Sequence, residues 1–312
     1  MNLTRILNIK YPLMQGAMAH IATAKFAASV SNAGGLGIIG AGAMTPQDLD
    51  AALAEMITLT DKPFGVNLML MNPHCHELAN VILTYKSYVK VVTTGAGNPG
   101  DLIRLFKEAG ILVAPVVPSV ALAKRVQRAG ADFIIVEGTE AGGHVGELTT
   151  MALVPQVIRA VDIPVVAAGG IASTNQLLAA FALGAVGVQV GTCLLATTEC
   201  GIHENYKKAV LQAKDTSTIV TGRSVGAPVR ILKNQMARQY VKLESEGKTR
   251  DELEHLTLGA LRRAVFDGDA DYGSVMIGQV AGMINEVKSV KEVIENLFLD
   301  LPKIYEALGK II

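Results

Sequence analysis

One segment of the sequence combines a single histidine with many glycines: the run from Glu137 to Gly146, which contains His144. Glycine neighbours leave the imidazole free to approach a substrate or a flat ring, because no bulky side chains surround it. Histidine is the side chain that can donate or accept a proton near neutral pH. The segment therefore predicts a catalytic acid or base, and the alternative is a turn histidine that only hydrogen-bonds the backbone.

Two further segments contain residues suited to binding a phosphate group. Gly169 and Gly170 follow one predicted strand, and Gly191 and Thr192 follow the next. Neither segment contains lysine or arginine, so the charge of the anion would be balanced mainly by backbone N–H groups and helix dipoles. The pattern predicts a site for the phosphate monoester of a bound cofactor.

Other residues of chemical interest have simpler interpretations. His74 and His76 would need ligands from elsewhere to bind a metal, so we interpret them as the start of a surface helix and predict no metal site. Cys193 stands beside two leucines, which indicates a buried and unreactive thiol. The segment 273–279 either begins a helix or returns over the rim, where Ser274 and Gln279 would reach the cofactor.

These residues would be positioned by strands that alternate with helices along the first two thirds of the chain. Apolar runs rich in Val and Ile, each bounded by Gly or Pro, are typical of parallel strands covered on both faces. We predict strands at residues 11–18, 36–40, 64–70, 89–93, 111–117, 132–137, 165–168 and 186–190. We predict helices at residues 22–33, 46–59, 77–86, 101–109, 120–129, 151–161 and 175–183, and one that begins near residue 194.

Eight such units favour a closed (β/α)8 TIM barrel, an α/β fold, over an open doubly wound sheet, which usually has fewer parallel strands. In a TIM barrel the functional residues collect at the carboxyl ends of the strands. Nearly every predicted strand end carries glycine, which predicts a large ligand at that rim. Several predicted helices also end in a glycine, where a left-handed turn is expected, at Gly34, Gly110, Gly130 and Gly184.

The last third of the chain is more charged and predicts a small, mainly helical extra region after the eighth strand. We divide the chain into barrel residues 1–197, a helical cap or substrate region at 198–271, and C-terminal helices at 272–312 that return to the barrel. The predicted helix at 176–183 is apolar all round, so its outer face must also be buried. The C-terminal helices, or a second subunit in a possible homodimer, should cover it.

Composition and charge exclude several classes of protein. Of the 312 residues 50% are hydrophobic, and 28 Lys+Arg balance 28 Asp+Glu, which argues against a disordered chain and against a dedicated nucleic-acid binder. Three cysteines at unrelated spacings form no disulfide framework, and no signal peptide is evident, which favours the cytoplasm. The uncharged stretch 163–198 is broken by Pro, Gly and polar residues, so we predict no membrane span.

A resemblance to a known family covers nearly the whole chain and is carried by residues 61–67, 92–99, 137–146, 167–171, 189–192 and 273–279. These segments resemble the FabK-type, flavin-dependent enoyl-acyl-carrier-protein reductases of fatty acid biosynthesis. The same superfamily contains the nitronate monooxygenases, formerly called 2-nitropropane dioxygenases, which share the glycine–histidine loop.

The resemblance implies a TIM barrel that binds FMN at its rim, with NADH or NADPH as co-substrate and an enoyl thioester of acyl-carrier protein or CoA as substrate. The catalytic histidine of the family corresponds to His144. One departure is the first rim segment, Gly16-Ala17-Met18-Ala19-His20, which lacks the tryptophan of many relatives. The residues implied in cofactor binding are Gln15, Gly16, Ala17, Met18, Asn67, Thr94, Glu137, Gly142, Gly143, Gly169, Gly170, Gly191, Thr192, Met276, Gly278 and Gln279.

The resemblance leaves two activities open. In an enoyl reductase, His144 would stabilise the enolate and donate a proton to the α-carbon after hydride transfer to the β-carbon. In a nitronate monooxygenase, His144 would instead be the base that removes a proton from a nitroalkane. A third interpretation is a barrel that binds flavin or phosphate without catalysis and acts through its extra region.

Overall fold

Eight parallel strands form a closed barrel in the computed structural model, which describes residues 2–310. Their order is β1-β9-β8-β6-β5-β4-β3-β2, and a bridge between Met14 and Leu36 joins β1 to β2. The strands are β1 (Leu13–Gln15), β2 (Gly37–Gly40), β3 (Phe64–Met69), β4 (Val89–Gly95), β5 (Leu112–Val117), β6 (Ile134–Glu137), β8 (Val165–Ala168) and β9 (Gly187–Val190). The predicted TIM barrel is therefore confirmed, and the open sheet is excluded.

A helix follows each barrel strand, as the periodicity predicts. At the start of α3, Thr45 and Asp48 form a reciprocal capping box. The four glycines expected in left-handed turns all have φ between 79° and 101°, which confirms that prediction. The helices are α2 (Ala24–Asn32), α3 (Pro46–Leu59, after the 3₁₀ turn η1, Ala41–Ala43), α4 (Cys75–Thr84), α5 (Gly100–Glu108), α6 (Val120–Arg128), α7 (Thr150–Ile158), α8 (Thr174–Ala182) and α9 (Thr192–Leu195).

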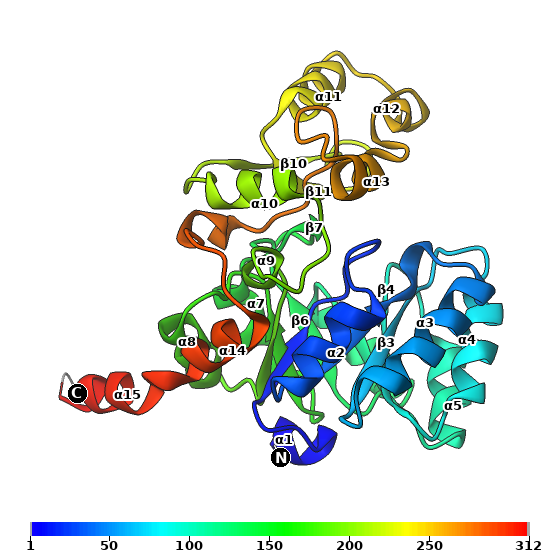
Figure 1. Cartoon of the computed structure of the whole chain (residues 1–312), viewed down its shortest axis with the longest axis vertical. Helices are drawn as coiled ribbons and strands as arrows, with labels where there is room; N and C mark the ends of the chain where they lie inside the picture. The colour runs from blue at the N-terminus through cyan, green and yellow to red at the C-terminus, as the bar shows by residue number, and fades with distance from the viewer. Residues whose placement is uncertain (1, 311–312) are drawn as a thin grey trace.

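Two hydrophobic cores stabilise the barrel. One fills its interior and includes Met14 and Phe133, and the other lies between the strands and the outer helices. The short helix α1 (Leu3–Leu7) closes one end of the interior, where Leu3 and Leu7 are fully buried in the first core. Figure 1 shows α1 at the end of the barrel opposite β7 and α9. The carboxyl ends of the strands therefore form the other end, beneath the later part of the chain.

The segment after β9, which we call the cap (residues 198–271), contains an unexpected sheet. Strands β10 (Thr218–Thr221) and β11 (Val229–Leu232) pair antiparallel, and β11 also pairs with β7 (Gly143–His144) from the loop after β6. Figure 1 shows these elements above the carboxyl-end rim of the barrel. The cap is mainly helical, as expected, but the sequence does not indicate this sheet. Its helices are α10 (Glu204–Leu211), α11 (Gln235–Ser245), α12 (Arg250–Thr257) and α13 (Ala260–Arg262), followed by the π-helical turn η2 (Arg263–Asp267).

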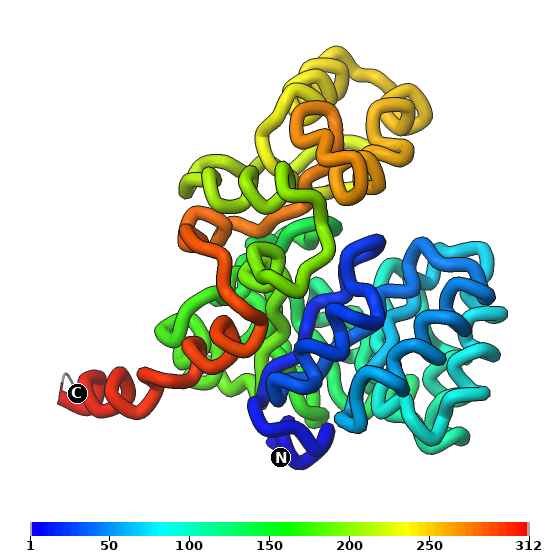
Figure 2. Tube along the Cα trace, viewed as in Figure 1, coloured from blue at the N-terminus to red at the C-terminus, as the bar shows by residue number. Residues whose placement is uncertain are grey.

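The C-terminal segment returns from the cap to the side of the barrel, and Figure 2 shows its path. It contains the 3₁₀ turn η3 (Gln279–Met283), α14 (Val290–Leu299) and α15 (Leu301–Gly309). Both α14 and α15 pack against α8, and Thr174 Oγ1 donates a hydrogen bond of 3.1 Å to Asn296 O. The prediction that C-terminal helices cover this apolar helix is confirmed. Across residues 2–310, no helix has the length and apolar character needed to cross a membrane.

The interior core gives a test of barrel stability. Leu7→Ala should reduce the free energy of unfolding by about 2–5 kcal/mol, because it removes a fully buried side chain from a packed interior. Leu299→Ala is the matched control: Leu299 is 72% exposed, so its truncation should change stability by less than about 0.5 kcal/mol. Urea unfolding measures both variants, and equal losses would show that α1 is not part of the core.

Candidate active site

The expected site residues occupy the carboxyl ends of the barrel strands. Gln15 ends β1, Glu137 ends β6, and Gly169 and Gly191 directly follow β8 and β9. In the parallel register β1 and β9 end together, as do β6 and β8, so these residues lie at one level of the barrel. Residues far apart in the sequence are therefore gathered at the rim where this fold carries its functional groups.

Two buried polar atoms at this rim lack a protein partner. Gln15 and Thr94 are 0% and 1% exposed, and neither Gln15 Nε2 nor Thr94 Oγ1 has a hydrogen-bond partner in the described part of the chain. Buried polar side-chain atoms are normally hydrogen-bonded, so these two indicate where a polar ligand belongs. Nearby, Asn67 Nδ2 donates to Thr93 Oγ1 at 3.0 Å, which fixes the Asn67 amide at the same rim.

The first rim segment continues from β1 through Gly16, Ala17 and Met18. Gly16 N donates a hydrogen bond of 2.7 Å to the last residue of β9, which keeps this segment beside the sheet. His20 follows with a φ of +63°, and its ring packs edge-on against Phe266 of η2, with centroids 5.8 Å apart. The rim and the cap therefore touch here, in a contact that the sequence does not indicate.

Glu137 is an acidic side chain among apolar strands. Burial raises the pKa of its carboxyl group to about 7, because it removes the water that would stabilise the charged form. A carboxyl group with a pKa near neutrality can hold or release a proton under ordinary conditions, as acid–base chemistry requires. Glu137 is thus a titratable group of the site on its barrel side.

Gly169 and Gly170 form a backbone turn suited to an anion. Their φ angles are +88° and +77°, a conformation that favours glycine. Successive backbone N–H groups in such turns form concavities that bind anions. A Cβ atom on Gly169 would lie 2.9 Å from Gly138 O, so close packing also requires glycine there. The geometry is compatible with the predicted phosphate site, which stays a prediction.

The other predicted phosphate segment contacts the chain that returns from the cap. We call residues 276–279 of that chain the returning segment. Gly191 precedes α9, and Thr192 Oγ1 accepts a hydrogen bond of 2.9 Å from Gly278 N. Gln279 N donates to Glu140 O at 2.9 Å, which joins the returning segment to the loop that contains His144. The Thr192 hydroxyl oxygen therefore holds the returning segment. The hydrogen of this hydroxyl can still be donated to a ligand.

The returning segment also packs directly against the His144 loop, which we define as residues 138–148. A Cβ atom on Gly142 would lie 2.6 Å from Ile277 C, so only glycine fits there. Met276 O accepts a hydrogen bond of 3.0 Å from the hydroxyl of the fully buried Tyr206, and the Met276 sulfur lies beside Gly143. These residues have a packing role, and their contact with a cofactor stays a prediction.

His144 stands on β7, where backbone pairing with β11 places it opposite Val229. Its side chain is exposed, which leaves the imidazole accessible, and its assignment as a catalytic acid or base rather than a turn histidine stays a prediction. Partial burial still removes enough water from the imidazole to lower its pKa from the ordinary value of 6.5. His144 is therefore neutral near pH 7 and able to accept a proton.

Two weaker candidates have the roles predicted for them. His74 precedes α4, and its Nδ1 lies 2.9 Å from Glu77 Oε2 at the surface. Cys193 is buried, and burial raises the pKa of its thiol to about 12, which confirms an unreactive cysteine. Among the described residues, no three His, Cys, Asp or Glu side chains are placed to share a metal ion.

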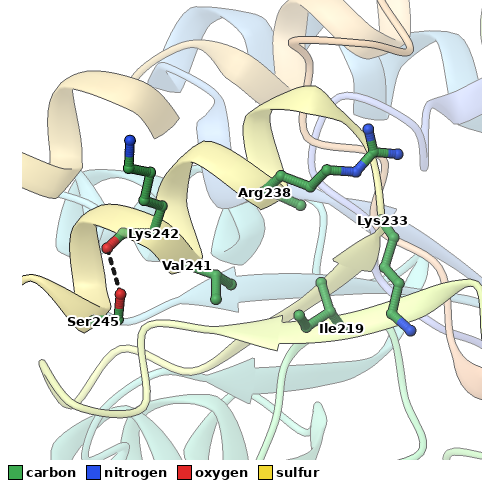
Figure 3. A pocket seen from close by; sticks show the side chains of 7 residues that line it. Ile219, Lys233, Arg238, Val241, Lys242 and Ser245 are labelled. Atoms are coloured by element: carbon green, nitrogen blue, oxygen red, sulfur yellow. Dashed lines mark hydrogen bonds between the residues drawn. The ribbon is translucent and has the colours of Figure 1, made fainter.

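Sequence reasoning missed the charged groups of the cap. Arg230 is 6% exposed and reaches the His144 loop, and its only sequence signal is a lone arginine in an apolar run. The cap also contains a cavity of about 320 Å³ beside α11, shown in Figure 3. Ile219, Lys233, Arg238 and Lys242 are among its lining residues, and no predicted site residue is. This cavity is therefore distinct from the rim.

Glu137 provides a pH-dependent test in the ligand-free protein. Its pKa is about 7 in the folded protein against an ordinary value of 4.5, so folding favours the protonated form and stability is lost as the pH rises through 7. Glu137→Gln should therefore raise the free energy of unfolding by about 3 kcal/mol at about pH 8 and change it little at about pH 4. Urea unfolding measures the difference, with Glu306→Gln on exposed α15 as control. An equal gain at both pH values would contradict the raised pKa.

Comparison with known structures places the chain among oxidoreductases. Residues 1–300 match the family model described as nitronate monooxygenase. FabK from Thermotoga maritima is 48% identical, with a TM-score of 0.96, and the match covers 99% of this chain and 98% of that chain. Nitroalkane oxidase from Streptomyces ansochromogenes is 29% identical, with a TM-score of 0.86 and coverage of 98% and 99%.

Similar sequences carry further names. The (3aS,4S,5R,7aS)-5-hydroxy-7a-methyl-1-oxo-octahydro-1H-indene-4-carboxyl-CoA dehydrogenase of Mycobacterium tuberculosis is 33% identical, over 96% of this chain and 95% of that protein. A "Probable nitronate monooxygenase" of Staphylococcus saprophyticus is 33% identical, over 94% and 95%. These names share oxidation–reduction chemistry and differ in substrate. From the match over residues 1–300 and these relatives, the chain belongs to the nitronate monooxygenase family.

Proposed function

We propose that this protein is an enoyl-thioester reductase of fatty acid biosynthesis that binds FMN and oxidises NADH or NADPH. The observation that carries the proposal is the 48% identity to FabK over 99% of the chain, against 33% for the dehydrogenase and monooxygenase relatives. The substrate in this proposal is an enoyl thioester on acyl-carrier protein or CoA.

The rim residues fit a bound FMN. Bound FMN would supply the hydride-transfer chemistry that links the nicotinamide coenzyme to the β-carbon of the enoyl thioester. The two unpartnered polar atoms of the rim would find their partners on the flavin. The residues proposed to hold the phosphate are Gly169, Gly170, Gly191 and Thr192. Those proposed to line the ring are Gln15, Gly16, Ala17, Met18, Asn67, Thr94, Glu137, Gly142, Gly143, Met276, Gly278 and Gln279.

His144 would act on the substrate from the cap side of the rim. Its lowered pKa keeps the imidazole neutral, so an N–H can donate a hydrogen bond to the thioester oxygen as negative charge develops there. The exposed side chain can take up a proton from water and transfer it to the α-carbon. Glu137, with its pKa near 7, can hold a proton on the barrel side of the same site.

Nitronate monooxygenase is the second candidate function, and two observations favour it. The matching family model is described by that activity. A neutral His144 is also the protonation state needed to remove an α-proton from a nitroalkane. The same imidazole would then accept a proton where the reductase needs it to donate one.

The oligomeric state and the location in the cell are also proposals. We propose a homodimer and a cytoplasmic location. The exposed apolar side chains near the C-terminus are compatible with contact to a second copy, and they include Tyr305 and Leu308.

A paired assay separates the candidate activities. Flavin-replete enzyme receives crotonyl-CoA or an enoyl-acyl-carrier protein with NADH and NADPH in turn, and separately propionate nitronate with oxygen. We expect consumption of the nicotinamide coenzyme that depends on the thioester. Oxygen uptake with the nitronate and without a nicotinamide would contradict the reductase and support the monooxygenase. Turnover with neither substrate would support a binding protein.

His144→Ala tests the assigned proton chemistry. The variant should keep the yellow flavin colour but lose about 10²–10⁴ in turnover, which is the contribution of a positioned acid or base. His74→Ala is the matched control, because this histidine lies at the surface start of α4, and it should leave turnover unchanged. A His144→Ala variant with the full wild-type rate would remove His144 from the mechanism.

A further inference from the structure

Arg230 is a buried charged residue in the cap sheet. It lies in β11 and is 6% exposed, so its guanidinium has lost most of its water. Burying a charged group is unfavourable unless hydrogen bonds replace that water. Nε donates to Thr139 O at 3.0 Å, and Nη1 donates to Thr218 Oγ1 at 2.9 Å. Arg230 therefore joins β10 and β11 of the cap to the His144 loop.

Thr139 is the residue at which the His144 loop closes on itself. Its N–H donates to Leu148 O at 2.8 Å, so these two residues form the neck of the loop. Arg223 of the cap reaches the same neck, because it donates to Thr139 Oγ1 at 3.3 Å and pairs with Glu147. The Arg223 pair is exposed and screened by solvent, whereas the Arg230 contact is buried. Arg230 is therefore the stronger of the two anchors.

The strand that carries Arg230 also pairs with His144. In the pairing of β7 with β11, Arg230 lies opposite Gly143 and Val229 lies opposite His144. Strand β7 has only two residues, so the ladder alone is a short restraint. Gly143 has a φ of +79°, and glycine has other accessible conformations, so the backbone beside the imidazole needs a further anchor.

We propose that Arg230 is the positioning residue for His144. By fixing the neck of the loop at Thr139 O, its guanidinium keeps β7 against β11 and the imidazole at one place above the rim. Arg230 acts through His144 and does not touch the substrate. The kinetic part of this inference rests on the proposed function, because that function assigns the proton transfer to His144.

A double-mutant cycle tests the kinetic part on the flavin-replete enzyme. Arg230→Gln should lower kcat with crotonyl-CoA by up to about 100-fold, the loss expected when a reacting group is misplaced by about 1 Å. Flavin reduction by NADH without thioester should be unchanged, because that step does not use His144. In a His144→Ala background, Arg230→Gln should cause no further loss. Additive losses, or equal slowing of both half-reactions, would overturn the proposal.

Hydrogen–deuterium exchange tests the structural part without activity. Amides of residues 139–148 should exchange faster in Arg230→Gln than in the wild type, while those of α12 should not change. Arg238→Gln removes an exposed arginine of the same cap and should alter neither exchange nor kcat. Unchanged exchange in the His144 loop would overturn the proposal.

The proposal can still be tested if the Arg230→Gln variant does not fold or if the wild-type enzyme uses a nitronate. If Arg230→Gln does not fold, Arg230→Lys takes its place: it retains the charge but lacks the planar group that reaches both oxygens, so it should show the same selective loss. If wild-type enzyme turns over a nitronate and no enoyl thioester, the proposed function fails, and the same cycle with the nitronate still decides whether Arg230 acts through His144.

Discussion

The pairing of β7 with β11 is the interaction on which the candidate site depends. It attaches the loop after β6, which leaves a barrel strand, to a hairpin of the cap. Other contacts hold the rest of this loop, among them the hydrogen bonds to Thr139 O and Glu140 O, but this pairing is the one that includes the backbone of His144 itself. With it, a strand of the cap fixes the backbone of His144, which itself belongs to the loop after β6.

The closed barrel holds the carboxyl ends of its strands in fixed positions. Two backbone hydrogen bonds of 2.9 Å join β1 to β2, from Gln15 N to Leu36 O and from Leu36 N to Leu13 O, and they complete the ring. In a closed ring of parallel strands, no strand end can shift without its neighbours. The amides after β8 and β9 and the unpartnered side chains of the rim therefore keep fixed relative positions.

Most of the barrel could be predicted because its signals are local. Val/Ile runs, the capping residues of α3 and the glycines at helix ends each act within a few residues of their own position. The cap sheet could not be predicted from the sequence. Strand β11 has four residues and no distinctive periodicity, and its partner β7 is distant in the sequence. Within the site, residue type indicated His144 and the phosphate glycines. The raised pKa of Glu137 and the Arg230–Thr139 contact, which spans 91 residues, depend on tertiary packing.

The turn at Gly169 and Gly170 offers an anion only main-chain N–H groups. Every residue except proline has such a group, so exchanging neighbouring side chains does not abolish the anchor; only displacing the turn does. Substitutions around the rim and in the cap can therefore change which molecule reacts while the proposed phosphate site persists. The relatives named FabK, probable nitronate monooxygenase and CoA dehydrogenase carry different names over nearly the whole length of one chain, as such an arrangement allows.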